Sequence, residues 1–340
     1  MTPPSKKILV TGGLGFLGAP LVRALVKAGH KVRILDNASR GSEERLEDAR
    51  IRVEVVRGDV RDTEAVYKAV RGMESVFHLA AVNGTRNFYE KPAHVLEVGV
   101  KGMVNILDAC FQAGVGEIFF ASSSEVYQSP PHVPTDEKVP LSVPDPFNPR
   151  YSYGGSKIIG ELLIIHCGRE SFRRAVIVRP HNVYGPDMGW DHVIPQLTTR
   201  LLQQKVSSQG SGEEIPLQIQ GSGEQVRAFI YIDDFIDGLL RVFEHGEHLN
   251  IYNIGTTETI SMKEVAEQIA RCLGLKIQIL QGPEASGGTP RRCPDITKIG
   301  GLGFKPRVSF NEGLRRTVEW YAAHAPKAEK AALSSEKEDR

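Results

Sequence analysis

The first 180 residues alternate short apolar runs with amphipathic stretches, and this alternation constrains the fold more than any other feature of the sequence. Six apolar runs rich in Val, Ile and Phe favour strands: KILVTGG, KVRILD, RVEVVRGD, SVFHLAA, EIFFASSS and RAVIVRP. The stretches between them, such as APLVRALVKAG, place apolar residues at helical spacing. Strands that alternate with helices form βαβ units, so the sequence predicts a doubly wound α/β fold with a parallel sheet.

The alternation weakens after residue 180, which suggests a division into two domains. We predict a dinucleotide-type domain over 1–180 and a smaller α/β substrate domain over 181–320, with part of 225–255 returning to the first domain. Residues 325–340 are rich in Lys, Glu, Ala and Ser, and we expect a disordered tail there.

The composition argues against several classes of protein. A formal net charge of +1 gives no reason to expect a nucleic-acid partner, and 41% hydrophobic residues disfavour disorder. No apolar run of about 18 residues occurs, so we expect no membrane span. The N-terminus lacks a secretory pattern, and the four cysteines lack metal-ligand spacing. We therefore expect a cytoplasmic protein with reduced thiols and no metal site.

A glycine-rich turn, TGGLGFLG, joins the first predicted strand to the first predicted helix. Gly12 permits a tight turn, Gly15 lets backbone N–H groups approach a pyrophosphate, and Gly18 allows close packing of helix and strand. Such a turn can also serve packing alone. Because the strand, turn and helix follow in the required order, the sequence predicts a dinucleotide site.

The second predicted strand ends at Asp36, which lies 18 residues after Gly18. A carboxylate at this place accepts hydrogen bonds from the adenosine ribose. It would repel the additional phosphate of NADP, at a cost of roughly 4 kcal/mol per contact at about 4 Å, so NAD is favoured. Asp59 follows the third strand, where it either binds the adenine amino group or caps the next helix.

Tyr153 and Lys157 are four residues apart, so in a helix they lie on one face, about 5–6 Å from each other. A tyrosine with a pKa of about 10 becomes a base at neutral pH only if the phenolate gains roughly 4 kcal/mol. Lys157 and the positive nicotinamide ring of NAD are two cations that can supply it. The phenolate then takes a hydroxyl proton while the adjacent carbon gives hydride to NAD. The alternative is an exposed Tyr/Lys pair without function.

Six motifs together resemble the extended short-chain dehydrogenase/reductase family. They are TGGxGxxG, Asp36, HLAA at 78–81, SSSEVY at 122–127, YxxxK at 153–157 and RPHNVYGP at 179–186. The resemblance covers about residues 1–320 and points to the NAD-dependent nucleotide-sugar epimerases, dehydratases and decarboxylases. It implies a Rossmann domain, a C-terminal sugar-nucleotide domain, tightly held NAD and a homodimer.

The same resemblance implies roles for individual residues. Ser123 is the serine of the catalytic triad, Tyr153 the base and Lys157 its partner. Asn182 and Arg227 are expected to hold the nucleotide phosphates. The remaining residues expected at the cofactor are Phe16, Leu17, Asn37, Asp59, Val60, Leu79, Ala80 and Ala81.

The outcome of the reaction depends on the residues after the triad serine. A 4,6-dehydratase of this family carries Asp-Glu there, whereas this chain has Ser124 and Glu125. Dehydration is therefore disfavoured, and a 4-epimerase needs no acid at that place. Ser124 is then a substrate contact, and Glu125 is either a proton-transfer group or structural.

A third outcome is decarboxylation. The Ser-Glu pair, PR at 149–150 and RRCPDITKIGGLGFKP at 291–306 are similar to UDP-glucuronate decarboxylases. Arg292 would match a sugar carboxylate, but it would match a nucleotide phosphate equally well. His181 stands in an unfamiliar position and either contacts substrate or satisfies a backbone carbonyl. We predict an epimerase, with a decarboxylase as the alternative and a non-catalytic NAD-binding scaffold or sensor as a further one.

Overall fold

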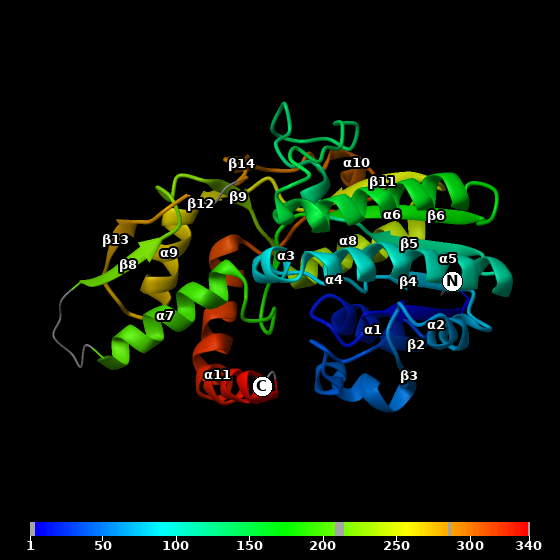
Figure 1. The fold of residues 1–340 in the computed structure, drawn as a ribbon, viewed down its shortest axis with the longest axis horizontal. Coiled ribbons are helices and arrows are strands. Elements are labelled where there is room, and N and C mark those ends of the chain that lie inside the picture. The colour runs from blue at the N-terminus through cyan, green and yellow to red at the C-terminus, as the bar shows by residue number, and fades with distance from the viewer. Residues whose placement is uncertain (1–3, 208–213, 285–286, 339–340) are drawn as a thin grey trace.

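The computed structural model describes residues 4–207, 214–284 and 287–338, and the side chains of 4–205, 214–284 and 287–325 (Figure 1). Its main feature is a seven-stranded parallel sheet with the strand order β11-β6-β5-β4-β1-β2-β3. The strands are β1 (Lys7–Thr11), β2 (Lys31–Asp36), β3 (Val53–Arg57), β4 (Ser75–His78), β5 (Glu117–Ala121), β6 (Arg174–Pro180) and β11 (Asn250–Ile254). The six predicted apolar runs form β1 to β6, so the doubly wound α/β fold is confirmed.

Helices cover both faces of this sheet because successive side chains of a strand point to opposite faces. In β1, Ile8 and Val10 belong to one hydrophobic core and Leu9 to the other. Five helices supply the opposing apolar side chains. The first core receives α1 (Gly18–Lys27) and α8 (Ile232–His245), and the second receives α2 (Thr63–Val70), α5 (Gly102–Ala113) and α6 (Ser152–Gly168).

A second group of elements lies to one side of the sheet, at the left of Figure 1. Helices α7 (Val193–Ser207), α9 (Met262–Cys272) and α11 (Phe310–Glu338) pack together there. Strand β8 (Ile215–Ile219) pairs with β13 (Ile277–Gln281). Strand β9 (Val226–Ala228) lies between β12 (Thr259–Ser261) and β14 (Arg291–Arg292). These strands bring the two arginines of β14 next to Arg227 of β9.

Short elements fill the connections between the longer helices and strands. They are α3 (Thr85–Glu90), α4 (Pro92–Leu96), a π-helical turn (Glu97–Lys101), 3-10 turns at Glu43–Arg52, Ser124–Val126 and Pro149–Tyr151, β7 (Val183–Tyr184), β10 (Ile230–Tyr231) and α10 (Thr297–Gly300). Strands β7 and β10 pair with each other. This pairing joins the segment that follows β6 to the segment that leads directly into helix α8.

The proline-rich segment 128–150 lies against the strand that carries Arg292. Thr135 N donates to Cys293 O at 2.9 Å, and Asp295 N donates to Thr135 O at 2.8 Å. Because this segment leads directly into α6, it links the C-terminal arginines to the helix of Tyr153 and Lys157.

Two predictions concern the C-terminal tail and the absence of membrane-spanning helices. Helix α11 continues to Glu338, but the side chains from residue 326 onward lie outside the described ones, so the expected disordered tail at 325–340 stays a prediction. In the ranges that the structure describes, no helix combines the length and the apolar character needed to cross a membrane.

Candidate functional site

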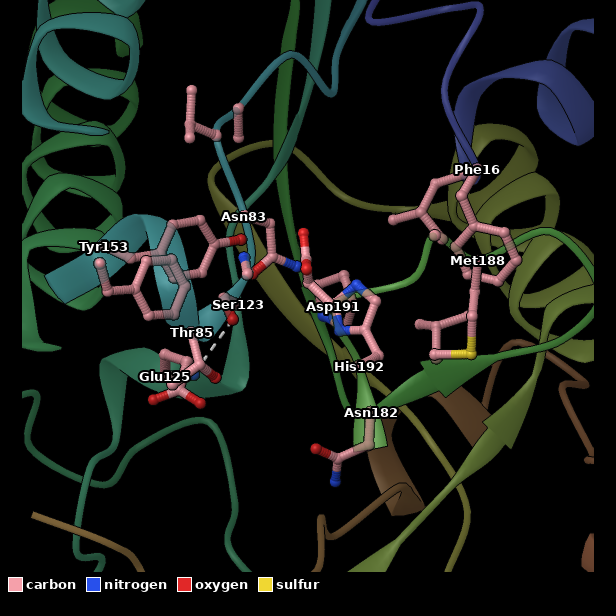
Figure 2. Close-up of a pocket in the computed structure, with 18 of the residues that line it drawn as sticks. Phe16, Asn83, Thr85, Ser123, Glu125, Tyr153, Asn182, Met188, Asp191 and His192 are labelled. Carbon is pink, nitrogen blue, oxygen red and sulfur yellow. Dashed lines mark hydrogen bonds between the residues drawn. The ribbon is translucent and has the colours of Figure 1, made fainter. Parts of the chain in front are cut away.

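A continuous cavity of about 1070 Å³ runs along the carboxyl edge of the sheet, from the glycine-rich turn to the arginines of β9 and β14. Ligands of open α/β sheets bind at this edge. Twenty predicted site residues line the cavity: Gly12, Gly15, Phe16, Leu17, Gly18, Asp36, Asn37, Asp59, Val60, Leu79, Ala80, Ala81, Ser123, Ser124, Glu125, Tyr153, Lys157, Asn182, Arg227 and Arg292. Figure 2 shows several of them around one space.

The structure does not bring His181 to this cavity. Its side chain is 1% exposed, and its Nε2 lies 3.1 Å from Asn253 Oδ1. Burial lowers its pKa to about 3, so the ring is neutral. His181 therefore lies beneath the cavity wall, and its partner is a side-chain amide rather than a backbone carbonyl.

The glycine-rich turn is packed too closely to accept side chains. A Cβ at Gly18 would lie 2.1 Å from Gly12 O, and Gly12 has a φ of +69° that disfavours other residues. Helix α1 starts at Gly18, and no side chain caps its N-terminus. Gly15, Leu17 and Gly18 line the cavity at this helix start, and a helix N-terminus at such a place fits the pyrophosphate of a dinucleotide.

Asp36 is oriented by the backbone around it. Its Oδ2 accepts from Leu14 N at 2.9 Å, and its Oδ1 accepts from Ala38 N at 2.7 Å. A carboxylate offers about four acceptor positions, so about two are left for a ligand. Asp36 thus fits the ribose hydroxyls of an adenosine.

The alternative role of Asp59 as a helix cap is wrong, because Asp62 caps α2 and accepts from Glu64 N and Ala65 N. Asp59 instead accepts from Asn37 Nδ2 at 3.0 Å and from Arg61 Nε at 2.9 Å. The hydrogen bond from Arg61 lowers the pKa of Asp59 to about 2, so the group is a carboxylate beside the cavity.

Tyr153 and Lys157 are buried in helix α6, with 8% and 3% of their surfaces exposed. Lys157 Nζ lies 5.6 Å from the centroid of the Tyr153 ring and donates to Ala121 O at 2.7 Å. The Tyr153 ring stacks on Phe88, with centroids 5.0 Å apart. The alternative of an exposed Tyr/Lys pair is therefore wrong as to exposure, because both side chains are buried.

The protein by itself does not lower the pKa of Tyr153. Burial raises that pKa above its usual value, while a hydrogen bond with Ser123 opposes the rise. Burial also lowers the pKa of Lys157 to about 7. The hypothesis that two cations stabilise the phenolate therefore needs the nicotinamide ring as well as Lys157.

Ser123 lies at the start of a 3-10 turn, where its Oγ accepts from Glu125 N at 3.1 Å (Figure 2). The carboxylate of Glu125 pairs with Arg292, with 2.6 Å between Oε1 and Nη1. Burial alone would raise the pKa of Glu125, but the charge and hydrogen bond of Arg292 lower it. Arg292 Nη2 also donates to Thr289 Oγ1 at 3.2 Å. Glu125 is therefore an ionised partner of Arg292.

Two further arginines face the same end of the cavity. Arg227 Nη1 donates to the carbonyl oxygens of Val226 and Pro290, and Arg150 lines the cavity nearby. Burial and the charges of Arg292 and Arg150 lower the pKa of Arg227. Asn182 donates from Nδ2 to Ala228 O at 2.8 Å. This end of the cavity therefore carries an excess of positive charge, which attracts phosphates or carboxylates.

Comparison with known proteins identifies the family. The model of the NAD dependent epimerase/dehydratase family matches residues 8–255. The chain belongs to this family. The resemblance drawn from the motifs is thus confirmed, and the protein is an NAD-dependent enzyme rather than a non-catalytic scaffold.

Individual members of the family differ in their reactions. A UDP-N-acetyl-alpha-D-glucosaminuronate decarboxylase of Bacillus cytotoxicus is 31% identical over 93% of this chain and 98% of its own. The UDP-glucose 4-epimerase of Thermotoga maritima, solved with UDP-glucose, has a TM-score of 0.81 and 29% identity over 93% and 99% of the two chains. The UDP-glucose 4-epimerase of Thermus thermophilus, solved with NAD, has a TM-score of 0.79 and 30% identity over 93% and 99%.

Some cavity residues of this family member were not anticipated as site residues. The sequence could have indicated Arg150 as a site residue, because it belongs to the PR motif directly before α6. Asn83, Asp191 and His192 lie on loops and Thr85 begins α3, all without a motif, and Figure 2 shows them at the same space. Within the described side chains, no group of three or more His, Cys, Asp or Glu gathers as a metal site would require.

Proposed function

We propose that this enzyme is a nucleotide-sugar 4-epimerase that acts through transient oxidation of the sugar at C4. The proposal rests on two features at the end of the cavity where the sugar would bind. Glu125 already forms an ion pair with Arg292 there, and Ser124 stands where a dehydratase needs an acid. Both features favour a neutral sugar that loses neither water nor CO₂.

NAD and three residues of the active site have separate roles in the oxidation of the sugar. NAD, when bound, supplies a hydride acceptor and a positive charge at its nicotinamide ring. Tyr153 takes the proton of the C4 hydroxyl, and Ser123 holds that oxygen by a hydrogen bond. Lys157 lies behind the tyrosine, where its charge stabilises the phenolate. The product of this step is a 4-keto-sugar.

Epimerisation then requires the keto-sugar to turn over and accept hydride on its other face. Arg227 and Asn182 would hold the diphosphate while the sugar turns. The cavity volume of about 1070 Å³ leaves room for this movement beside the cofactor. Tyr153 finally returns its proton to the oxygen at C4, so no other acid is needed.

The charges at the sugar end support a neutral sugar. Arg150, Arg227 and Arg292 all act on the carboxylate of Glu125, so three positive charges surround this carboxylate. A nucleotide diphosphate ester carries about two negative charges, which these arginines can bind. A sugar carboxylate would add a charge and would compete with Glu125 for Arg292.

Decarboxylation is the second candidate, and Arg150 is the observation that favours it. Within the described residues its guanidinium makes no hydrogen bond, so it is available to a sugar carboxylate. A 4-keto-uronic acid has its carboxylate β to the ketone and loses CO₂ readily. The relative from Bacillus cytotoxicus is named for a decarboxylation of this kind.

We also propose a homodimer in which α6 is covered by a second copy. Ile159 and Leu162 of this helix are 40% and 50% exposed, although its other face is packed in the core. A helix that is apolar on both faces is usually buried on both. Sedimentation of the wild type and of Leu162→Glu tests this, because a monomeric wild type would contradict it. The cytoplasmic location expected from the sequence stays a prediction.

The decisive experiment is incubation of the NAD-loaded enzyme with UDP-glucose, UDP-glucuronate and GDP-mannose, followed by mass spectrometry and NMR. An unchanged mass with inversion at C4 would support the epimerase. Loss of CO₂ from UDP-glucuronate would replace it with the decarboxylase. Loss of water from any substrate would contradict the role given to Ser124.

A further inference from the structure

Glu161 lies behind the Tyr153/Lys157 pair, and the proposed reaction gives it no task. It follows Lys157 by one turn of α6 and is 1% exposed. Its Oε1 accepts from Ser122 Oγ at 2.5 Å and from Arg179 Nε at 2.9 Å, and its Oε2 accepts from Arg179 Nη2 at 2.6 Å. Glu161 is thus a carboxylate buried beside a catalytic lysine but outside the cavity lining.

Stability alone gives a weak reason for this arrangement. Burying two charges costs several kcal/mol per ion, and replacing a buried ion pair by apolar residues is often neutral or stabilising. Arg179 is also held by Tyr127, whose OH lies 2.7 Å from its Nη1. Several hydrogen bonds therefore hold this pair one turn from Lys157.

The charges around Lys157 are few. From its own helix Tyr153 and Glu161 face it, and from β4 His78 does. His78 is neutral, because burial lowers its pKa to about 3 and its Nδ1 lies 2.8 Å from Thr11 Oγ1. Among the side chains that the structure describes, Glu161 is the negative charge that acts on Lys157.

We propose that Glu161 is a positioning residue that keeps Lys157 charged and so favours the phenolate of Tyr153. This inference rests on the proposed function only in taking Tyr153 as the base. When the two groups together hold one titrating proton, they form either a neutral pair or a phenolate beside an ammonium. A nearby carboxylate stabilises the ammonium and so the reactive phenolate.

The contacts of Ser122 keep the carboxylate in this place. Ser122 donates to Glu161, and the residue before it, Ala121, accepts from Lys157 Nζ. The residue after it is Ser123 of the triad. Burial lowers the pKa of Lys157 to about 7, and the charge of Glu161 opposes that change. Without Glu161 the neutral Tyr/Lys pair would therefore be favoured.

The test is titration of the Tyr153 phenolate by ultraviolet absorbance in the full NAD-loaded chain without any sugar. The signal is the difference between each protein and the same protein carrying Tyr153→Phe. Glu161→Gln is expected to move this titration upward by about one pH unit, which means roughly tenfold less phenolate at neutral pH. In Glu161→Asp, which keeps the charge, the titration is expected to lie close to that of the wild type.

The matched control is Ser122→Ala, which removes a hydrogen bond to the same carboxylate but keeps its charge. It is expected to move the titration by less than about 0.3 unit. A shift as large as that of Glu161→Gln would show that geometry rather than charge is responsible, and would overturn the proposal.

Glu161→Gln leaves Arg179 unpaired and can unfold the chain. The double variant Glu161→Gln/Arg179→Gln removes both charges and is expected to shift the titration in the same direction. An unchanged titration in whichever of the two proteins folds would overturn the proposal. Because no sugar is added, a failed substrate panel would refute the epimerase without changing this result.

Discussion

The cavity has a cofactor half, next to the glycine-rich turn, and a sugar half, next to the arginines of β9 and β14. The two halves are lined by different kinds of chemical groups. In the cofactor half many of the expected contacts come from the glycine-rich turn and Asp36, which lie within one strand–helix–strand unit. In the sugar half they come from charged side chains at 125, 150, 227 and 292, which are far apart in the chain. Backbone groups cannot be substituted, whereas charged side chains can be exchanged one at a time. The comparison indicates why members of one family share a cofactor but differ in reaction.

The largest expected effect falls where the two halves meet. Tyr153→Phe removes the base but keeps the ring that stacks on Phe88, so it should fold and retain NAD. We expect the rate to fall by at least about two orders of magnitude, the usual scale for a positioned base. Turnover assays and chromatographic measurement of bound NAD check this. A variant with nearly normal turnover would remove Tyr153 from the mechanism.

The next effect tests the backbone character of the cofactor half. In Gly18→Ala the new Cβ would meet Gly12 O at 2.1 Å, so the turn must open and NAD should be lost on gel filtration. We expect affinity for NAD to fall roughly a hundredfold, because about 3 kcal/mol of contacts depend on this turn. Gly300→Ala is the control, since no atom lies within 4 Å of its Cβ. Equal NAD content in the two variants would contradict the argument.

A smaller change should alter the sugar half alone. Glu125→Gln releases Arg292 from its 2.6 Å ion pair while keeping the shape of the side chain. We expect the affinity for UDP-glucuronate to improve about tenfold relative to UDP-glucose, or about 1.4 kcal/mol, with NAD content unchanged. Competition binding measured by calorimetry reports the ratio. If the ratio does not move, the balance of charges does not select the sugar.

The last expected effect, similar in size to that of Glu125→Gln, concerns the choice of cofactor. Asp36→Ala removes the carboxylate that would repel the additional phosphate of NADP. We expect the preference for NAD over NADP to relax by about tenfold rather than reverse, because Leu14 N and Ala38 N then lose their acceptors. Fluorescence titration with each cofactor measures this. Tighter binding of NADP by the wild type would refute the assignment of Asp36.

Much of the cofactor half could be predicted because its signals are local. The turn from Gly12 to Gly18 and Asp36 at the end of β2 lie in one unit, and backbone geometry follows from short motifs. The i,i+4 relation of Tyr153 and Lys157 is likewise local and was confirmed in α6. The role of Asp59 was not decided at this level, because Asp62 is an equally good cap three residues later.

The sugar half was predicted less completely, because its contacts join distant segments. The sequence names Glu125 and Arg292 separately, but their ion pair depends on the segment before β14 lying beside the chain after Glu125, where Thr289 Oγ1 donates to Gln128 O at 2.9 Å. His181 stands next to Asn182 in the chain, yet it turns toward Asn253 beneath the wall. Packing decides which of two neighbouring side chains faces the cavity, and no short sequence pattern predicts that packing.

The sequence by itself determined the sheet, the dinucleotide turn, the Tyr/Lys pair and the family, because each depends on residues within a few turns of the backbone. Tertiary structure alone decided the charge state of the site. Burial of Lys157, the carboxylate of Glu161 behind it and the pairing of Glu125 with Arg292 all arise from segments that meet only in the folded protein. Electrostatic energies depend on distance and desolvation in space, and neither follows from separation along the chain.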